Sequence, residues 1–363
     1  LYLGNDPSSY TGTAEYNVAF GKTALDAITD GDKNTAIGYD ALTNNTEGFD
    51  NVALGYQALK SNQTGDRNIA IGRGTLFSNT VDYNVAIGHS AMYANTDGTN
   101  NTALGFNALY ANITGDRNIG IGYAALDAAD TENDNLAIGY NALGGSVAGG
   151  EYNVAIGNNS LDATTSGDNN VALGYNALTA NTTGKSNVAI GHAALLTNDV
   201  GKQNIAIGDS ALLDLDPSTS ANGYGNVAIG SNAMEDATTG YANTAVGGYA
   251  FNSLTTGGNN ISVGYKSMEN ATTAWNNVAI GYQSLYGATN GTKMTGSSNT
   301  AVGYQSLYTN TSGNWNSAFG HSALKLNTTG YDNTSIGEYS MYYNTIGEYN
   351  VAVGTYALFQ NTT

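Results

Sequence analysis

The stretch Asn187-Val188-Ala189-Ile190-Gly191, followed by Ala194-Leu195, is one copy of a repeat that fills the chain. Variants of its first five residues recur twenty times, and fifteen of the nineteen intervals between their leading asparagines are 17 residues long. The asparagines lie at 17, 34, 51, 68, 84, 101, 118, 135, 153, 170, 187, 204, 226, 243, 260, 277, 299, 316, 333 and 350. One period along the whole sequence indicates a repeat architecture rather than several globular domains.

Each position of the unit, numbered from its Asn, holds a narrow set of residues. Position 1 is Asn and position 5 is Gly in all twenty units, while position 3 is Ala in seventeen. Position 4 is Ile, Leu, Val or Phe, position 9 is Leu, Met or Phe, and position 15 is usually Gly. Neither apolar segment has the spacing of a helix, so the unit predicts two short strands and two turns.

Such a small unit buries its apolar face only by stacking on a neighbour. We therefore predict an all-β fold, a parallel β-solenoid (β-roll) of about twenty-one coils, mostly 17 residues per coil. Residues 1–363 are expected to form a single uninterrupted array, about 100 Å long at the spacing of β-strands. Leu1 fits position 2 of the same frame and Thr363 fits position 14, so we expect a fragment of a longer fibre.

The columns also predict what holds the coils together. Ile or Leu at position 4 and Leu or Met at position 9, including Leu178, are expected to form apolar ladders in the core. Stacked asparagines at position 1 are expected to hydrogen-bond to one another and to a turn. Gly at position 5 is expected where the first strand ends and the chain bends or approaches another backbone closely.

Neither face of the first strand is suited to water. Val154 and Ile156, at positions 2 and 4, face one side, and the small Ala155 at position 3 faces the other. A strand that is apolar on both faces is usually covered on both, so we expect one face to pack against another copy of the chain. If the first strand is covered on both faces, replacing Ala155 and Ala172 with Glu should disrupt association before it unfolds coils, since small residues permit the close approach of a partner. The alternative is that position 3 is small because the coil is thin.

The composition argues against several classes of protein. The 29 acidic residues outnumber the 11 basic ones, which gives a formal charge of −18 and no basic face for nucleic acid. The absence of Cys excludes a disulfide framework. No run of 18 apolar residues is present, so no membrane-spanning helix is predicted.

The sequence offers little chemistry, and we predict no catalytic residue, no cofactor and no metal site, hence no enzyme. The histidines all occupy position 6, and His89 lies six coils, or about 29 Å, from His192, too far to share a metal ion. Two carboxylate pairs could hold a hard cation or act as acid and base, although solvated acidic turns explain them more simply. These pairs are Glu132 with Asp134 and Asp214 with Asp216.

Two features are candidates for ligand binding. Position 6 is often Tyr and forms an aromatic column that could stack on sugar rings or, alternatively, could be a packing ladder; its members are Tyr39, Tyr56, Tyr123, Tyr140, Tyr175, Tyr265, Tyr282 and Tyr304. Two 22-residue units carry five extra residues each, within 213–225 and 286–298. Insertions in repeat proteins often lie on the binding face, so these loops could contact a ligand. Alternatively, they could be surface loops that the fold tolerates and that have no function. Their candidate contact residues are Asp214, Asp216, Tyr224, Tyr286 and Lys293.

The repeat motif, with Ala194-Leu195 after the glycine, resembles the head repeats of YadA-like trimeric autotransporter adhesins and related repeat arrays in bacteriophage tail fibres. The resemblance covers the whole chain and implies left-handed parallel β-rolls, a homotrimer about a common axis and a rod that binds host surfaces. The 17-residue unit is longer than the usual head repeat, and the chain shows neither a membrane-anchor barrel nor a coiled-coil stalk. A bacterial and a phage origin both stay open.

We therefore expect an extracellular, fibre-forming structural or adhesive protein at a cell surface or on a virion. Its expected partners are itself, as a homotrimer or head-to-tail filament, and surface glycans or a host-cell receptor. One alternative is a filament stacked end to end that binds no receptor. Another is an ice-binding solenoid, because regularly spaced threonines on a flat face can order water.

Overall fold

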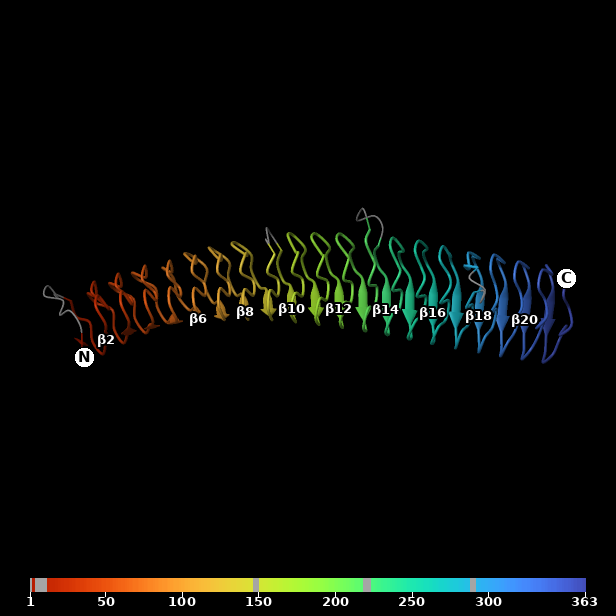
Figure 1. The fold of residues 1–363 in the computed structure, drawn as a ribbon, viewed down its shortest axis with the longest axis horizontal. Coiled ribbons are helices and arrows are strands. Elements are labelled where there is room, and N and C mark those ends of the chain that lie inside the picture. Colours follow the sequence, from red (N-terminus) through yellow and green to blue (C-terminus); the bar gives the residue numbers. More distant parts are fainter. Residues whose placement is uncertain (1, 4–11, 146–149, 218–222, 288–291) are drawn as a thin grey trace. The chain divides into compact units, whose positions relative to one another are not determined.

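The computed structural model describes residues 2–3, 12–145, 150–217, 223–287 and 292–363, and all regular structure within them is β. Each coil contributes one short strand, and strands of neighbouring coils within a unit pair in parallel (Figure 1). The all-β parallel β-solenoid with about 17 residues per coil is thus confirmed. The strands are β1 (Tyr2–Leu3), β2 (Val18–Phe20), β3 (Thr35–Ile37), β4 (Val52–Leu54), β5 (Ile69–Ile71), β6 (Val85–Ile87), β7 (Thr102–Leu104), β8 (Ile119–Ile121), β9 (Leu136–Ile138), β10 (Val154–Ile156), β11 (Val171–Leu173), β12 (Val188–Ile190), β13 (Ile205–Ile207), β14 (Val227–Ile229), β15 (Thr244–Val246), β16 (Ile261–Val263), β17 (Val278–Ile280), β18 (Thr300–Val302), β19 (Ser317–Phe319), β20 (Thr334–Ile336) and β21 (Val351–Val353).

The chain divides into two compact units that are built from the same coil. The first is Leu1–Tyr175 with Asn181–Thr183, and the second is Asn176–Ala180 with Gly184–Thr363. Strands β1 to β11 lie in the first unit and β12 to β21 in the second. That the two units form one uninterrupted array remains a prediction from the repeat.

Strand register keeps every sequence column in line within a unit. In the first unit Val154 pairs with Val171, Ala155 with Ala172 and Ile156 with Leu173. The same register holds across the 22-residue repeat with its five-residue insertion in the second unit, where Ile205 pairs with Val227. An insertion therefore leaves the stacking of the strands intact, because it lies outside the paired segment.

The core differs from the prediction at position 4. The alanines of position 3 and the Leu or Met residues of position 9 are almost all fully buried, and Leu178 is among them, as predicted. Positions 2 and 4 instead face outward: in β11 the central Ala172 is buried while Leu173 is 43% exposed. The expected core ladder of Ile and Leu at position 4 was wrong, and so was the expectation that Ala155 and Ala172 form the associating face.

Position 3 is small because the interior of the coil is thin. Gly120 replaces Ala at this position in β8, and a Cβ atom built there lies 3.2 Å from Cγ of Leu109 and 3.0 Å from the carbonyl oxygen of Ala125. A methyl group fills the gap between the strand and the position-9 ladder, and a larger side chain would overpack it. The alternative that the sequence left open is therefore confirmed.

The predicted second strand, at positions 8 and 9, is absent from the described residues. Position 9 has a left-handed backbone instead, with φ of 54° at Leu25 and 48° at Leu42. This conformation is unusual for a bulky residue. It is stabilised because each leucine is buried and its N–H bonds the neighbouring coil, as Leu25 does to the carbonyl oxygen of Ala41 at 3.1 Å.

The predicted asparagine ladder at position 1 is confirmed. Asn153 is fully buried, and its N–H donates to Oδ1 of Asn135 at 2.9 Å. Its Nδ2 donates to the carbonyl oxygen of Gly167 at 2.8 Å, and its Oδ1 accepts the N–H of Asn170 at 3.0 Å. Each asparagine thus satisfies three buried polar groups, which would otherwise cost free energy.

A second asparagine ladder at position 12 was not predicted. Asn62 and Asn112 are buried, and Nδ2 of each donates to Oδ1 of the asparagine one coil earlier, at 2.9 and 2.7 Å. The same amides also bond the carbonyl oxygens of Gly65 and Gly115 in the following turn. These interior asparagines fix the turn that leads into the next coil.

Candidate functional site

The outward face of the strands is a broad apolar surface in both units. It is made by positions 2 and 4, which we call the outer sheet face. Its most exposed members include Val18, Phe20, Leu54, Ile69, Leu104, Ile119, Leu173, Ile205, Ile229, Ile261, Ile280, Phe319 and Ile336. Isolated apolar side chains are common on protein surfaces, but contiguous stripes of them usually mark interaction sites.

The aromatic column at position 6 is exposed, and most of its rings are stacked on one another. The eight predicted tyrosines are between 43% and 52% exposed. Ring centroids lie 5.4 Å apart for Tyr39 and Tyr56, 5.2 Å for Tyr123 and Tyr140, and 5.2 Å for Tyr282 and Tyr304. These distances and the nearly parallel planes are typical of favourable aromatic packing, so the column is a ladder of rings that pack on each other.

Two residue types outside the predicted set continue this ladder. Phe106 stacks between His89 and Tyr123, at 5.1 and 5.3 Å, and His321 stacks on Tyr304 at 4.9 Å. Because neighbouring rings cover the faces within the ladder, a sugar ring could not stack there without displacing one. The edges and hydroxyl groups of the rings remain open to solvent.

A second aromatic column, at position 10, was missed in the sequence. Tyr93 lies between Phe77 and Tyr110, with centroid distances of 4.9 and 5.5 Å. Lysines take the place of rings at some rungs, and Nζ of Lys325 lies 5.7 Å from the Tyr308 ring and 5.6 Å from the Tyr342 ring. The recurrence of aromatic and Lys residues at one position was the available signal.

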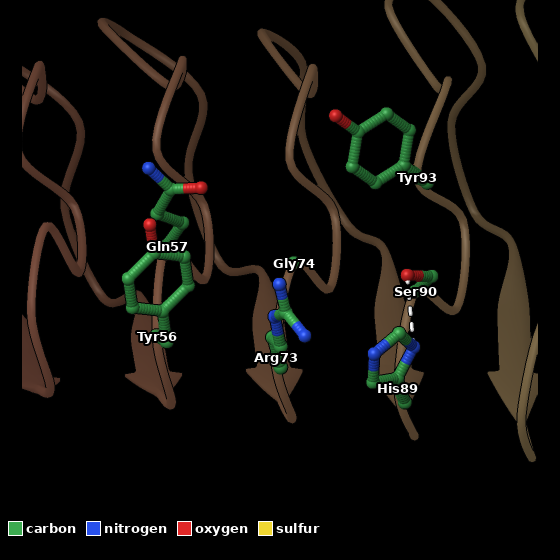
Figure 2. Close-up of a pocket in the computed structure, with 7 residues that line it drawn as sticks. All are labelled: Tyr56, Gln57, Arg73, Gly74, His89, Ser90 and Tyr93. Atoms are coloured by element: carbon green, nitrogen blue, oxygen red, sulfur yellow. Dashed lines mark hydrogen bonds between the residues drawn. The ribbon is translucent and has the colours of Figure 1, made fainter.

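A pocket lies between the two aromatic columns where three consecutive coils of the first unit meet (Figure 2). Its volume is about 190 Å³. The lining residues are Tyr56 and Gln57 of one coil, Arg73 and Gly74 of the next, and His89, Ser90 and Tyr93 of the third. Tyr56 was predicted as a member of the aromatic column, but the pocket was not predicted.

Arg73 contributes a cation to this pocket. Its guanidinium carbon lies 5.6 Å from the Tyr56 ring centroid. The other two arginines of the chain have polar partners: Arg117 bonds both carboxylate oxygens of Asp134, at 2.6 and 2.8 Å, and Arg67 donates to the Tyr83 hydroxyl. Within the described part of the chain, the Arg73 guanidinium forms neither an ion pair nor a hydrogen bond, while the Arg73 carbonyl oxygen accepts the N–H of Ser90 at 2.9 Å.

The residues predicted from the first insertion do not form a joint site with each other in the described segments. Asp214 and Asp216 are exposed on the coil that precedes 218–222, and those five positions lie outside the described residues. Tyr224, on the far side of the insertion, stacks on Tyr241 with centroids 5.3 Å apart. The Tyr224 ring therefore packs against the neighbouring coil and not against Asp214 or Asp216.

The second insertion is similar, and 288–291 again lie outside the described residues. Tyr286 stacks on Tyr308 at 5.0 Å, and burial together with a hydrogen bond to Glu269 raises the pKa of its hydroxyl above the usual value. Lys293 is exposed, and its Nζ lies 3.2 Å from Oγ of Ser253. Both side chains thus have contacts within the coils, and a ligand role for either stays a prediction.

The other candidate side chains have structural partners. His192 bonds Asp209 through Nδ1 at 2.8 Å. The Glu132 carboxylate accepts the N–H groups of Asp130 and Thr131. The bond from Arg117 lowers the pKa of Asp134 below its usual range.

Among the described residues no group of three His, Cys, Asp or Glu side chains is placed to hold a metal ion. The same residues contain no helix that is long and apolar enough to cross a membrane.

Threonine hydroxyls at position 13 are engaged in bonds between coils. Oγ1 of Thr46 donates to the carbonyl oxygen of Gln63 at 3.1 Å, and that of Thr311 to the carbonyl oxygen of Thr328 at 2.9 Å. Because these hydroxyl groups donate their hydrogen to a carbonyl oxygen of the next coil, that hydrogen cannot also bind and order water molecules at the surface. This bonding favours a role in the turn over ice binding.

No protein-family model and no curated protein matches this sequence. The resemblance to adhesin and tail-fibre repeats therefore rests on the repeat motif alone.

Proposed function

We propose that the chain is a structural, non-enzymatic fibre protein that associates with further copies of itself through the outer sheet face. The observation that carries the proposal is the stripe of exposed Val, Ile and Leu at positions 2 and 4. Parallel sheets in proteins are normally covered on both faces, and here the coil interior covers only one. A second copy carries the same stripe in the same register, so the two surfaces are chemically matched.

This arrangement favours lateral association over stacking end to end, because an end-to-end filament would leave the stripe in contact with water. Burial of apolar surface contributes about 25 cal/mol per Å², and two residues from every coil would add up along the stripe. A homotrimer, an extracellular location and an adhesive role at a cell surface or on a virion are what the family resemblance implies. They form part of the proposal, with a glycan or a host-cell receptor as the further partner.

A triple variant tests the proposal. Leu54, Leu104 and Leu173 are each between 42% and 45% exposed on the outer sheet face. Replacing all three with Glu should convert an oligomer into a monomer in sedimentation velocity, because charged groups resist burial in an apolar interface. Circular dichroism should stay unchanged, since each substitution at a surface strand position should lower the free energy of unfolding by only about 1 kcal/mol.

The matched control places three glutamates on exposed turns of the same unit, at Asn44, Thr114 and Ala163. This control should remain oligomeric, which would separate a local effect at the outer sheet face from a general effect of added charge. A wild-type chain that sediments as a stable monomer at its highest soluble concentration would contradict the proposal.

A further inference from the structure

The coil that begins at Asn68 departs from the repeat at several points. It spans 16 residues instead of 17, and it carries Arg73 at position 6. Gly74 is the only glycine at position 7 among the twenty units, and Thr75 is the only threonine at position 8. In a chain this regular, departures gathered in one coil indicate a local role that the stacking does not require.

The absence of a side chain at Gly74 opens the pocket. Neighbouring coils carry Gln57 and Ser90 at this position, and both side chains line the pocket on either side of the glycine (Figure 2). A Cβ atom built on Gly74 lies 3.6 Å from the Tyr93 ring and 3.8 Å from Oγ of Ser90, which is ordinary contact. A side chain would therefore fit, so the glycine is not required by crowding.

The pocket combines one cation with several neutral polar groups. The Arg73 guanidinium carries five N–H donors, and none of them has a partner in the described residues. Gln57 adds an amide, whose Nε2 also donates to Oδ2 of Asp40 at 3.3 Å. Ser90 adds a hydroxyl, which lies 3.0 Å from Nδ1 of His89, and Tyr56 and Tyr93 add phenol groups. The faces of both tyrosine rings are already covered, Tyr56 by Tyr39 and Arg73, and Tyr93 by Phe77 and Tyr110. A ligand would meet ring edges and hydrogen-bonding groups.

We propose that this pocket binds one sugar residue that carries a carboxylate. A planar guanidinium pairs with a carboxylate through two parallel hydrogen bonds, which makes Arg73 the anchor. The amide and hydroxyl groups around it match the hydroxyl groups of a sugar. The volume of about 190 Å³ lies below the range of about 300–1,000 Å³ that is typical of larger ligands, so a single ring is the fitting size.

The site does not depend on the proposed self-association, because it is formed by positions 6, 7 and 10 rather than by the outer sheet face. The two proposals therefore fail separately. The triple Glu variant of the outer sheet face should bind the sugar as the wild type does, whether or not the wild type proves to be an oligomer.

The test is a titration of the full chain with methyl β-D-glucuronide, followed by isothermal calorimetry and by ligand-observed nuclear magnetic resonance. Methyl β-D-glucoside lacks the carboxylate, and acetate lacks the ring, so each isolates one half of the recognition. We expect saturable binding of the glucuronide at one site per chain, and at least about tenfold weaker binding of the other two, because a charged hydrogen bond or its loss changes affinity by that factor.

Two variants locate the binding. Arg73→Gln should weaken it by at least about tenfold, since the paired charge is lost. Gly74→Asn should do the same by filling the pocket, and it should fold, because Asn107 and Asn141 hold the same backbone conformation at this position, with φ of 54° and 49° against 62° at Gly74. The matched control Arg67→Gln removes an arginine outside the pocket and should bind as the wild type does.

Several results would overturn the proposal. One is no binding of the glucuronide, and another is equal binding of the glucoside, which would leave Arg73 without a role. Equal binding of acetate would reduce the pocket to a simple anion site. Unchanged affinity in Arg73→Gln would place any binding elsewhere, and this variant decides the matter even if Gly74→Asn fails to fold.

Discussion

Ala155→Asp is expected to destabilise the chain by about 4 kcal/mol or more, because it places an unpaired charge in a fully buried position. Ala155 lies in the middle of β10, between Ala137 of β9 and Ala172 of β11. The methyl ladder leaves no room for a carboxylate and offers it no partner. Urea unfolding followed by circular dichroism measures the loss.

Val154→Asp and Ile156→Asp are the matched controls, because they place the same charge on the same strand but on the outer sheet face. Both side chains are only half-buried, and each substitution should cost about 1 kcal/mol, the usual size for a surface strand position. If Ala155→Asp were tolerated while its two neighbours unfolded the chain, the orientation of the strand would be the reverse of the one described.

Gly105→Ala is expected to cost about 3 kcal/mol or more, since it combines backbone strain with overpacking. Gly105 follows β7 at position 5 with φ of 141°, a conformation that L side chains rarely adopt. A Cβ atom there would lie 2.1 Å from the carbonyl oxygen of Gly122 in the next coil. Because that atom belongs to the backbone of a neighbouring coil, it cannot move away without disturbing the stack.

Gly74→Ala serves as the control for Gly105→Ala. Its φ of 62° is also positive, but Ala124 and Ala193 hold the same conformation at the same position in other coils, and a Cβ atom on Gly74 would make only ordinary van der Waals contacts. We expect a change of about 1 kcal/mol or less. Equal losses at Gly74 and Gly105 in thermal or urea unfolding would show that close approach of the coils is not the reason for the glycine column.

Much of the fold could be predicted from the columns. A strict period with Asn at position 1, Gly at position 5 and Leu or Met at position 9 is compatible with few structures, and the position-9 ladder and the first asparagine ladder both lie where the sequence places them. The orientation of the strand could not be predicted with the same certainty. Alternation puts Ala155 opposite Val154 and Ile156, but only the thickness of the coil decides which side is inside. That thickness depends on how the position-9 side chain packs across the coil, and this packing cannot be predicted from the repeat pattern.

The second predicted strand failed for a related reason. A short apolar pair such as Ala41-Leu42 is compatible with a strand, and leucine rarely adopts a positive φ. The inter-coil hydrogen bonds and the burial of the leucine override that preference. The frequent Asn, Ser and Gln residues at position 7, which is also left-handed, were the available indication of a turn.

The candidate sites show a similar division. The tyrosine column could be predicted from the sequence, because eight units carry Tyr at position 6 and equivalent positions stack in a solenoid. The pocket depends on one missing side chain at Gly74 and on the aromatic column at position 10 across from it, and only the packing of three coils brings these together. Gly74 is nevertheless visible in the sequence as the one glycine of its column, so a search for departures from the repeat would have found it.

The most direct test of the central claim is thiol labelling, because the chain contains no Cys and single cysteines can be placed at will. The variants are Val154→Cys, Ala155→Cys and Ile156→Cys, each labelled with a maleimide in the native state across a range of protein concentrations. At low concentration we expect rapid labelling at 154 and 156 and strong protection at 155. As the concentration rises and copies associate, 154 and 156 should become protected too. Rapid labelling at 155 would show that position 3 does not face the coil interior. Labelling at 154 and 156 that never slows as the concentration rises would show that the outer sheet face does not associate.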